Sequence, residues 1–342
     1  MAQQYGGVVG TGISSPTAFL QNTLDSISQK YIHPSISDIV LSPSTTYWAL
    51  QRSGKHNKGT ELVFPLLTQE EPTGGEFWGD QLLDTSTVDS IQPANQIWRA
   101  IYQNVAIPTL DLIISSGSSA LSLLKAKMQA CAASLLPKLA RNCYGVAPNN
   151  GPLSIDNIPS WIGTQNNTIA GINRATTTAW NPANTVNVGA AALSPTTVEQ
   201  GYAAVTFGYD EPDTLVALNT DLSNFKLTFV QPGTTTTSII RSVDNMSEDK
   251  TVQTSLRRHF RYNNLICLND NYVAPPATGS LGGTYAYMWN SKYMWMNYHP
   301  KAYFIIRPWL MASNQEVISS RVIVVMQLTN VNPRTAVAFG NI

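Results

Sequence analysis

The residues that most often carry catalysis are few and scattered along this chain. No two of its four histidines have the spacing of a metal-ligand pair: His33, His56, His259 and His299. We therefore expect each to be a structural or surface residue. Three neighbouring carboxylates, Glu70, Glu71 and Glu76, are of the residue type that glycoside hydrolysis uses. They flank a Pro-Thr-Gly-Gly turn, so a solvated or intersubunit charge cluster is the preferred interpretation.

Other signatures of catalysis are missing from the sequence. Neither a Gly-x-Ser-x-Gly motif nor a phosphate-binding glycine loop occurs. Cys131, Cys143 and Cys267 are odd in number and widely separated, so neither a disulfide framework nor a zinc site is expected. We expect no enzyme activity, no catalytic residue, no cofactor and no metal.

The densest basic run covers residues 257–262 and reads Arg-Arg-His-Phe-Arg-Tyr. Arginines interleaved with aromatic rings can contact nucleic acid nonspecifically, through phosphates and base stacking. The chain has 21 basic and 21 acidic residues, whereas tight nucleic-acid binders carry a basic excess. We favour an intersubunit ion-pair patch for Arg257 and Arg258, and nonspecific contact with DNA stays open as the alternative.

An aromatic pair, Phe77 and Trp78, follows the turn at residues 72–75. No apolar periodicity surrounds the pair, so it does not belong to a regular core element. Exposed rings of this size would be a liability in a monomer. We predict that both rings pack on a neighbouring chain.

The composition suits a chain that is surrounded by copies of itself, and a secreted β-protein would have a similar composition. Of its 342 residues, 43% are hydrophobic and only 12% are charged, against a usual charged fraction of about 25%. Interface centres are depleted in charge because desolvating an unpaired ion is costly. The first residues lack a basic stretch followed by an apolar run, and no apolar stretch reaches about 18 residues, so we expect neither a secretory signal nor a membrane partner.

The first hundred residues predict an arm and a hairpin. A Ser-Pro N-cap and apolar residues at helical spacing predict a helix over 15–31. Two strand-like runs, Glu61–Leu67 and 81–85, lie on either side of the turn and predict a long hairpin that projects from the body. Alternation of apolar and polar residues then predicts a strand over 97–107.

The longest helical pattern covers Ser118–Tyr144, where apolar residues recur every three or four positions. Gly145 stands where a helix C-cap belongs. Pro137 lies inside the pattern, and an interior proline costs about 3 kcal/mol and kinks a helix. We therefore predict a long helix that bends near its last two turns.

After residue 150 the apolar runs become short and turn residues abound. Alternating residues predict a strand over 225–230, and a continuous apolar run predicts a buried strand over 322–328. Nine aromatic residues fall within 284–310, and we expect them to pack in the core more than to stack on a ligand. One dominant helix with scattered strands indicates an α+β fold and neither a doubly wound nor a barrel pattern.

Four stretches, in this order along the chain, resemble one protein family. They are residues 169–176 (Ile-Ala-Gly-Ile-Asn-Arg-Ala-Thr) followed by Trp180, residues 210–216, the run from 265 to 295, and the C-terminal end from 314. Together they resemble the major capsid proteins of tailed double-stranded-DNA phages, which have the Hong Kong 97-like fold. Asn173 stands where many members have Asp, so an Asp-Arg pair at this position is in doubt.

The resemblance implies a division of the chain into parts. Residues 1–50 would be an N-terminal arm, and 51–96 an extended loop that reaches over a neighbouring subunit. Residues 97–145 would form the peripheral domain with its long spine helix, and 146–318 mostly the axial domain. Residues 319–342 would return to the peripheral domain as the C-terminal strand.

The resemblance also implies function. Many copies, arranged as pentamers and hexamers, would build an icosahedral shell around packaged double-stranded DNA, assembled in the host cytoplasm as the virion capsid. Partners would be other copies of the chain, a portal, scaffolding or decoration proteins, and DNA by nonspecific contact. Besides the residues named above, the resemblance makes Arg174 and Trp180 candidate assembly contacts.

Two alternatives stay open. One is a bacterial encapsulin-like nanocompartment, which has the same fold and encloses enzymes in place of DNA. The residues around Gly171 and the C-terminal Gln-Leu-Thr-Asn at 327–330 favour the phage branch. The other is a monomeric β-rich protein that binds or hydrolyses carbohydrate, for which an aromatic-lined cleft is expected.

Overall fold

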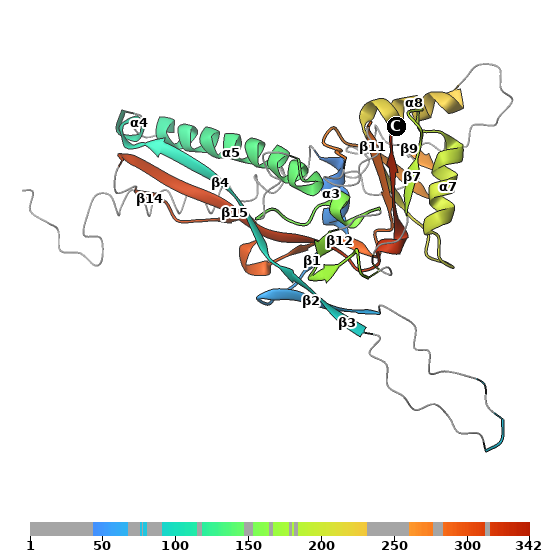
Figure 1. The fold of residues 1–342 in the computed structure, drawn as a ribbon. Helices are drawn as coiled ribbons and strands as arrows, with labels where there is room; N and C mark the ends of the chain where they lie inside the picture. Colours follow the sequence, from blue (N-terminus) through green and yellow to red (C-terminus); the bar gives the residue numbers. More distant parts are fainter. Residues whose placement is uncertain are drawn as a thin grey trace, which may run out of the picture. The chain divides into compact units, whose positions relative to one another are not determined.

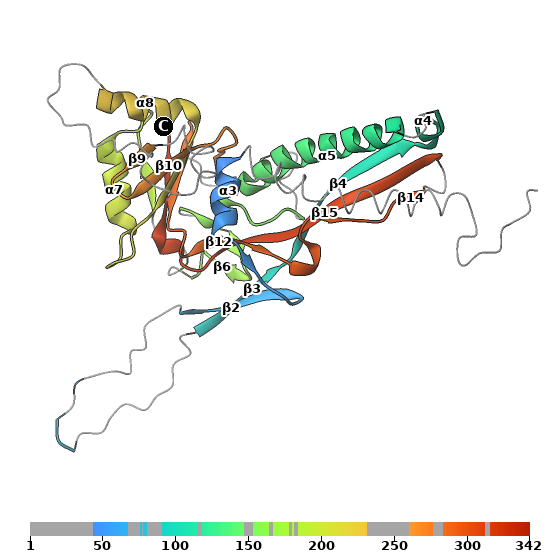
Figure 2. The same cartoon turned by 180° about the vertical axis from the view of Figure 1, so that it is seen from behind.

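The computed structural model describes residues 44–67, 76, 78–80, 91–114, 118–146, 153–163, 167–177, 180, 184–230, 260–275, 283–311 and 315–342 (Figure 1 and Figure 2). The chain divides into two compact units. One contains Tyr102–Leu135 and Phe304–Val324, and the other contains Leu41–Ile101, Leu136–Tyr303 and Val325–Ile342. The helix predicted over 15–31 and the strand predicted over 81–85 lie outside the described residues.

The first unit combines long strands with a helix. Its elements, some of which continue past the unit's boundary, are β4 (Arg99–Pro108), α4 (Thr109–Ile114), α5 (Ser118–Tyr144), β13 (Ile305–Ile306), β14 (Leu310–Met311) and β15 (Val317–Asn330). The short strands β13 and β14 pair antiparallel with β15, and β4 also joins β15. Val105 and Ile107 of β4 and Val322 of β15 are buried, so the core side of each strand carries β-branched residues.

Helix α5 has the bounds that the sequence predicts. Its buried residues recur every three or four positions and form one apolar stripe: Leu124, Met128, Cys131, Leu135 and Leu139. The helix continues through Pro137, and the bend there stays a prediction. Gly145 has φ +64, and Val146 N–H donates to Arg141 O at 3.1 Å. This is the left-handed glycine cap that closes a helix end.

The second unit is built on a six-stranded sheet, called here the β8 sheet, with the order β7-β16-β11-β8-β10-β9. Its strands are β7 (Thr185–Asn187), β8 (Thr214–Ala217), β9 (Phe260–Tyr262), β10 (Leu265–Asn269), β11 (Tyr285–Trp289) and β16 (Ala336–Gly340). Helices α7 (Pro195–Val205) and α8 (Asn219–Val230) pack on one face, where Val198, Phe225 and Phe339 belong to one buried cluster. At Gly201 of α7 an added Cβ would lie 2.3 Å from the Phe339 ring, so this close approach requires glycine.

The strand predicted over 225–230 is wrong, because these residues form the last half of α8. Leu222 and Phe225 are buried, whereas Leu227 is 61% exposed. The burial therefore follows the three-residue spacing of a helix and not the alternation of Phe225, Leu227 and Phe229. A six-residue apolar alternation is too short to separate the two interpretations without the residues that precede it.

The aromatic residues of 284–310 pack largely in the core, as the sequence predicts. Tyr285, Tyr287 and Trp289 alternate with Ala286 and Met288 along β11, and all five are buried. The aromatic set lies on the sheet face opposite α7 and α8, because Ala286 and Met288 belong to the cluster beneath those helices. Tyr287 Oη donates to Ala274 O at 2.6 Å, so its hydroxyl is satisfied.

The second unit also contains several shorter elements. They are α3 (Thr45–Arg52), β1 (Lys55–His56), β2 (Glu61–Leu67), β3 (Ile91–Ile97), α6 (Ile158–Trp161), β5 (Thr168–Ile169), β6 (Ile172–Asn173), β12 (Met294–Tyr298) and the short 3-10 helices Pro300–Ala302 and Pro333–Thr335. β12 pairs parallel with β1 and antiparallel with the end of β15. The buried strand predicted over 322–328 is confirmed within β15, which is longer than predicted.

The hairpin region confirms one predicted strand and corrects another. β2 covers Glu61–Leu67 as predicted, and it pairs antiparallel with β3. The strand predicted over 97–107 is in fact divided: Ile97 ends β3 and β4 begins at Arg99. The alternation of apolar and polar residues in the sequence cannot reveal this break, because the pattern continues through it. What changes is the strand with which the chain pairs, from β2 to β15.

Candidate assembly surfaces

The β2–β3 hairpin has two unlike faces. Its register runs from Glu61 opposite Ile97 to Leu67 opposite Ile91, so every second pair faces the same way. On one face Leu62 and Leu66 are buried, together with Ala94 and Gln96 of β3. On the outer face three large apolar side chains are more than half exposed: Val63 at 62%, Ile91 at 54% and Ile97 at 56%. Exposed β-branched residues grouped on one strand pair indicate a surface that another molecule covers.

A proline pair restricts how a partner can dock on this hairpin. Pro65 of β2 lies opposite Pro93 of β3. Since proline has no backbone N–H, neither strand can donate at this level to a strand added along its edge. Both outer edges are therefore poor templates for strand addition. The hairpin is suited to docking through its outer face.

A buried polar network holds the hairpin at its root. Gln96 Nε2 donates to Asp156 Oδ2 at 2.7 Å and to Leu328 O at 3.0 Å, and Thr329 Oγ1 donates to Gln96 Oε1 at 2.6 Å. Gln327 Nε2 also donates to Asp156 Oδ2, at 2.8 Å. Both polar ends of the Gln96 side chain are thus satisfied, which a buried amide requires. The network joins β3 to β15 and fixes where the hairpin begins.

Asp156 is the ionisable member of this network. Burial raises the pKa of its carboxyl above the ordinary value of 3.8, while the hydrogen bond from Gln96 and the charge of Arg99 act in the opposite direction. Desolvation therefore outweighs both favourable interactions. The Asp156 carboxyl at the root of the hairpin is therefore protonated at a higher pH than a free carboxyl.

The predicted aromatic contact is described only in part. Trp78 is 86% exposed, and Glu76 and Asp80 beside it are exposed as well. Phe77 lies outside the described residues. An indole with this exposure is a candidate contact for another chain, and the packing of Phe77 and Trp78 on a neighbour stays a prediction.

Arg174 and Trp180 lie inside their own chain. Arg174 is fully buried and its guanidinium donates to three backbone carbonyls: Trp180 O at 2.8 Å, Ser160 O at 2.7 Å and Gly163 O at 2.6 Å. Burial lowers the pKa of this guanidinium to about 10. Asn173 does not pair with it and instead accepts from Ala175 N–H. Arg174 therefore ties α6, the β5–β6 turn and Trp180 together, so any effect of Arg174 on assembly would be indirect.

Residues 257–262 are also described only in part. Arg257 and Arg258 lie outside the described residues, as does His259. Arg261 and Tyr262 belong to strand β9. Arg261 lines a pocket on the second unit, and the role predicted for the two preceding arginines stays a prediction.

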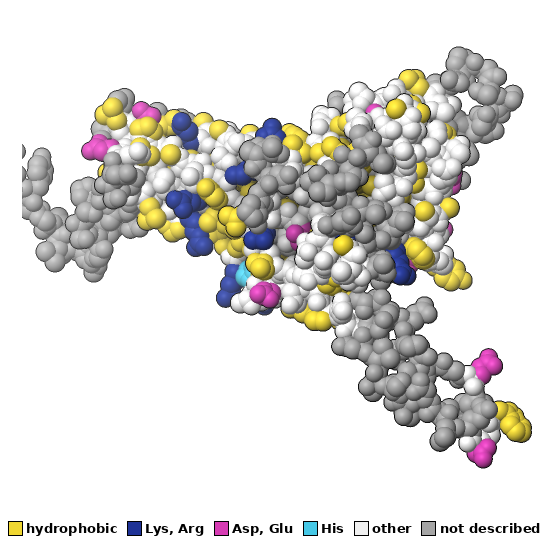
Figure 3. All heavy atoms as spheres, in the orientation of Figure 1, with side chains coloured by type: hydrophobic (Ala, Val, Ile, Leu, Met, Phe, Trp, Pro, Cys, Tyr) yellow, Lys and Arg dark blue, Asp and Glu magenta, His cyan; other side chains and the backbone are white. Residues whose placement is uncertain are grey.

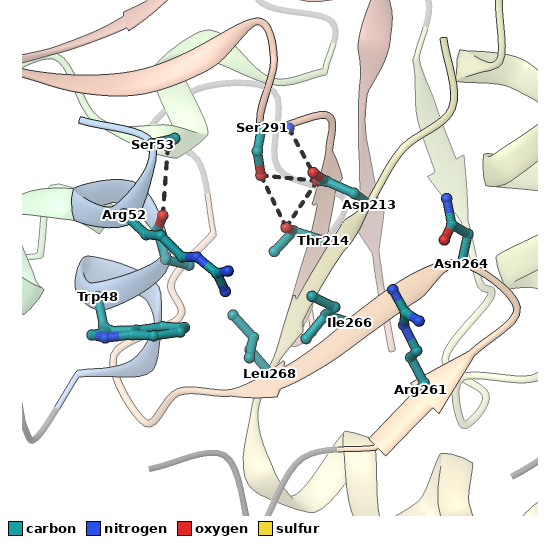
Figure 4. Close-up of a pocket in the computed structure, with 11 residues that line it drawn as sticks. Trp48, Arg52, Ser53, Asp213, Thr214, Arg261, Asn264, Ile266, Leu268 and Ser291 are labelled. Carbon is teal, nitrogen blue, oxygen red and sulfur yellow. Dashed lines mark hydrogen bonds between the residues drawn. The ribbon is translucent and has the colours of Figure 1, made fainter. Parts of the chain in front are cut away.

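This pocket has a volume of about 420 Å³ and is drawn in Figure 4. Helix α3 supplies Trp48, Ala49 and Arg52, and the β8 sheet supplies Thr214, Arg261 and the apolar pair Ile266 and Leu268. Figure 4 shows the side chains of Arg52 and Arg261 on either side of Ile266 and Leu268. No pattern in the sequence predicts this pocket, because its two walls, residues 48–53 and 213–291, lie far apart along the chain.

On the face drawn in Figure 3 charge is sparse, and the Lys, Arg, Asp and Glu side chains form small separate groups. Among the described residues no group of three or more His, Cys, Asp or Glu side chains could hold a metal ion. No helix in the described part of the chain is long and apolar enough to cross a membrane. Cys131, Cys143 and Cys267 are all buried and free of disulfides.

Neither a family profile nor a curated protein matches this sequence. Solved structures do match. The capsid of cyanophage A-1(L) superimposes with a TM-score of 0.58 and 14% identity, covering 88% of this chain and 93% of that one. The encapsulin of the holo-SrpI complex from Synechococcus elongatus gives a TM-score of 0.54 and 11% identity, covering 87% and 88%. The capsid of a native GTA particle gives 0.53 and 9%, covering 99% and 94%.

At these identities the likeness concerns the fold. The chain has the mixed helix-and-sheet fold of phage capsid and encapsulin shell subunits, the Hong Kong 97-like fold that the sequence predicts. These three structures are a phage capsid, an encapsulin and the capsid of a GTA particle. The domain boundaries predicted at residues 50, 96, 145 and 318 stay predictions.

Proposed function

We propose that this chain is the major capsid protein of a tailed phage, many copies of which close into an icosahedral shell around packaged double-stranded DNA. The observation that supports this most strongly is the match to the cyanophage A-1(L) capsid, which covers 88% of this chain and 93% of that one. Coverage of most of both chains supports a likeness that extends beyond a single common module. A function is argued from sites as well as from folds, and the outer face of the hairpin supplies such a site.

The proposed mechanism is geometric. One chain must fit both pentamers and hexamers, so projecting elements adjust while the packed core stays rigid. The β8 sheet with its buried cluster is the rigid part. The β2–β3 hairpin, whose edges carry the Pro65–Pro93 pair, lays its outer face on the next subunit. Each contact is weak, and the closed shell is stable because every subunit makes many of them at once.

The parts of the chain follow the family pattern in this proposal. Residues 1–50 act as the arm, 51–96 as the extended loop, 97–145 and 319–342 as the peripheral domain, and 146–318 mostly as the axial domain. The shell is assembled in the host cytoplasm. Its further partners are a portal, scaffolding or decoration proteins, and DNA touched nonspecifically.

An encapsulin-like shell is the second candidate, because the encapsulin from Synechococcus elongatus matches over 87% of this chain. The two candidates differ in what the shell contains. A phage capsid holds nucleic acid, whereas an encapsulin holds protein cargo. The absence of a basic excess, at 21 basic and 21 acidic residues, suits a container that does not bind its DNA tightly and is equally compatible with protein cargo.

Electron microscopy of the purified protein tests the proposal. Closed particles of uniform diameter are expected, and their size gives the triangulation number. Particles isolated from phage lysate should contain nuclease-protected DNA. Particles that carry a co-purifying enzyme and no protected DNA would favour an encapsulin-like shell. A protein that stays monomeric at micromolar concentration would contradict both the capsid and the encapsulin hypotheses.

A further inference from the structure

The pocket between α3 and the β8 sheet contains two arginines, Arg52 and Arg261. Neither forms an ion pair with a described residue, and Arg52 lies over the Trp48 ring, 5.8 Å from its centroid. The Nε of Arg261 is buried and has no hydrogen-bond acceptor among the described residues. Buried donors are nearly always paired, so this atom indicates an acceptor that lies beyond the described residues.

The acid already in the pocket does not supply it. Asp213 Oδ1 accepts from Ser291 N–H at 3.0 Å, from Ser291 Oγ at 2.9 Å and from Thr214 Oγ1 at 2.9 Å. Figure 4 shows these hydrogen bonds joining the carboxylate to Ser291 and Thr214. The guanidinium groups of Arg52 and Arg261 lie on either side of the apolar floor.

The lining defines the chemistry of the occupant. Ile266, Leu268 and the Trp48 indole form an apolar floor and wall, and the guanidinium groups stand beside them. A volume of about 420 Å³ accommodates a few side chains and is within the usual range for ligand pockets. A run of phosphates fits poorly, because the floor of the pocket is apolar. An aromatic side chain flanked by carboxylates fits both features.

The chain carries such a group on its own surface. Trp78 is 86% exposed, and the carboxylates of Glu76 and Asp80, two residues to either side, are exposed and have no ion pair with a described residue. With equal numbers of basic and acidic residues, copies of the chain can neutralise one another. Charge complementarity therefore selects a second copy as the partner.

We infer that the pocket lined by Trp48, Arg52 and Arg261 receives Trp78 of a neighbouring copy, with Glu76 and Asp80 of that copy facing the two arginines. The inference rests on the proposed function, since it requires an assembly of copies. The inference identifies the pocket that binds the exposed Trp78 indole, whereas the likeness in fold identifies no such pocket. Arg261 Nε gains its missing acceptor in this contact.

Cysteine trapping between separate chains tests the contact. One chain carries Trp78→Cys and the other, distinguished by a size tag, carries Ala49→Cys; both are co-assembled and oxidised. A disulfide heterodimer is expected on a non-reducing gel. Background is low because the native cysteines are buried, and burial raises the pKa of Cys131 to about 11 and that of Cys267 to about 12. Tyr209→Cys, at a fully exposed position outside the pocket, replaces Ala49→Cys as the matched control and should give no heterodimer.

Charge reversal gives a second readout on shell yield by sedimentation. Arg52→Glu with Arg261→Glu should lower the yield at least about tenfold, because like charges then face each other across the contact. Glu76→Lys with Asp80→Lys should do the same, and all four changes together should restore assembly. Arg334→Glu, at an exposed position away from the pocket, is the matched control and should assemble normally.

The outcomes separate the two proposals. Shells that form without the heterodimer, and whose yield ignores the arginine reversals, overturn the pocket contact and leave the proposed function intact. Arginine reversals that release DNA while the heterodimer is absent also overturn it, in favour of a nucleic-acid site. A wild-type chain that forms no shells overturns the proposed function itself.

Discussion

The β8 sheet and the β2–β3 hairpin differ in how far their apolar side chains are buried within the chain. The sheet buries both faces within the chain: Phe339 and Met288 lie in the cluster under the helices, and Tyr287 lies buried on the other face. The hairpin buries Leu62 on one face and leaves Val63 and Ile97 more than half exposed on the other. The β8 sheet thus buries its apolar residues within its own chain, whereas the outer face of the hairpin is buried only when another molecule covers it.

This difference separates two kinds of stability. Substitutions in the β8 sheet act on the folding of the subunit, because they remove contacts that every copy makes with itself. Substitutions on the outer face of the hairpin act on association, because the contacts they remove belong to the assembly. The comparison fails if substitutions in the two regions affect unfolding to the same extent.

The largest effect is expected at Phe339. Phe339→Ala should lower the free energy of unfolding of the subunit by about 3–5 kcal/mol, because a fully buried ring is lost and a cavity remains. Urea denaturation followed by tryptophan fluorescence measures this. Phe207→Ala is the control, since Phe207 is 48% exposed, and its effect should stay within about 1 kcal/mol. Equal effects at both positions would mean that the β8 sheet does not contain the core of this unit.

Arg174→Met should lower the free energy of unfolding by about 2–4 kcal/mol, because the carbonyls of Trp180 and Gly163 lose the donor from Arg174, and Ser160 O keeps the bond from Asn167 Nδ2 alone of its two side-chain donors. Arg174→Lys should recover only part of this, since an ammonium cannot reach three divergent acceptors as the guanidinium does. The exposed Arg334 supplies the control, and Arg334→Met should change stability by less than about 0.5 kcal/mol. A loss of assembly by Arg174→Met without any loss of stability would instead place Arg174 at a contact between subunits.

A smaller effect is expected from the pH response of Asp156. Its pKa is raised in the folded chain, so the folded state binds more protons than the unfolded state between the ordinary carboxyl pKa and the raised value. The contribution of this group is therefore fully present below the ordinary pKa and is lost as the pH rises through the raised one. Asp156→Asn keeps an oxygen that accepts from Gln96 and Gln327, so it should flatten this part of the stability profile and leave the subunit at least as stable at neutral pH.

Stability profiles of the wild type and of Asp156→Asn, measured by urea denaturation from pH 4 to pH 8, test this prediction. Parallel profiles would show that Asp156 titrates normally in the folded chain. The exposed Glu61 at the start of β2 is a suitable control, and Glu61→Gln should leave the shape of the profile unchanged.

The smallest effect on unfolding is expected on the hairpin. Ile97→Thr should change the free energy of unfolding by less than about 0.5 kcal/mol, because the side chain is 56% exposed. The same change should reduce the yield of assembled particles, measured by sedimentation. Ile101→Thr, four residues further on and only 6% exposed, should destabilise the subunit by more than about 1 kcal/mol. Full assembly of the Ile97→Thr chain would mean that the outer face is not covered in the shell.

The sequence predicted elements that its own spacing specifies. Helix α5 and strand β2 have their predicted bounds, because a long apolar stripe closed by Gly145 and a short apolar run ended by a turn are local patterns. Helix α7 was missed, although Ser194 and Pro195 form a Ser-Pro cap like the one used to predict a helix at residue 15. The helix contains Thr, Gly and Val, and its buried residues Val198, Gly201 and Val205 make a weak apolar pattern.

The site could be predicted less well, because its parts meet only in three dimensions. Trp78 was singled out correctly as an exposed aromatic residue. Arg174 drew attention as part of a motif, yet no spacing in the sequence reveals its three acceptors, which are Ser160 O of α6, Gly163 O and Trp180 O. The pairing of Gln96 with Asp156 and Thr329 joins positions that are up to 233 residues apart. Long-range pairing of polar side chains has no signature in a single sequence.

The central claim is that the outer face of the β2–β3 hairpin becomes buried only when copies of the chain assemble. Electron microscopy of the purified wild-type protein tests this claim most directly. Closed particles of one diameter, with neighbouring subunits joined at the outer face of the β2–β3 hairpin in the reconstruction, are the predicted result. A protein that stays monomeric at micromolar concentration by light scattering, with no particles on the grid, would contradict it.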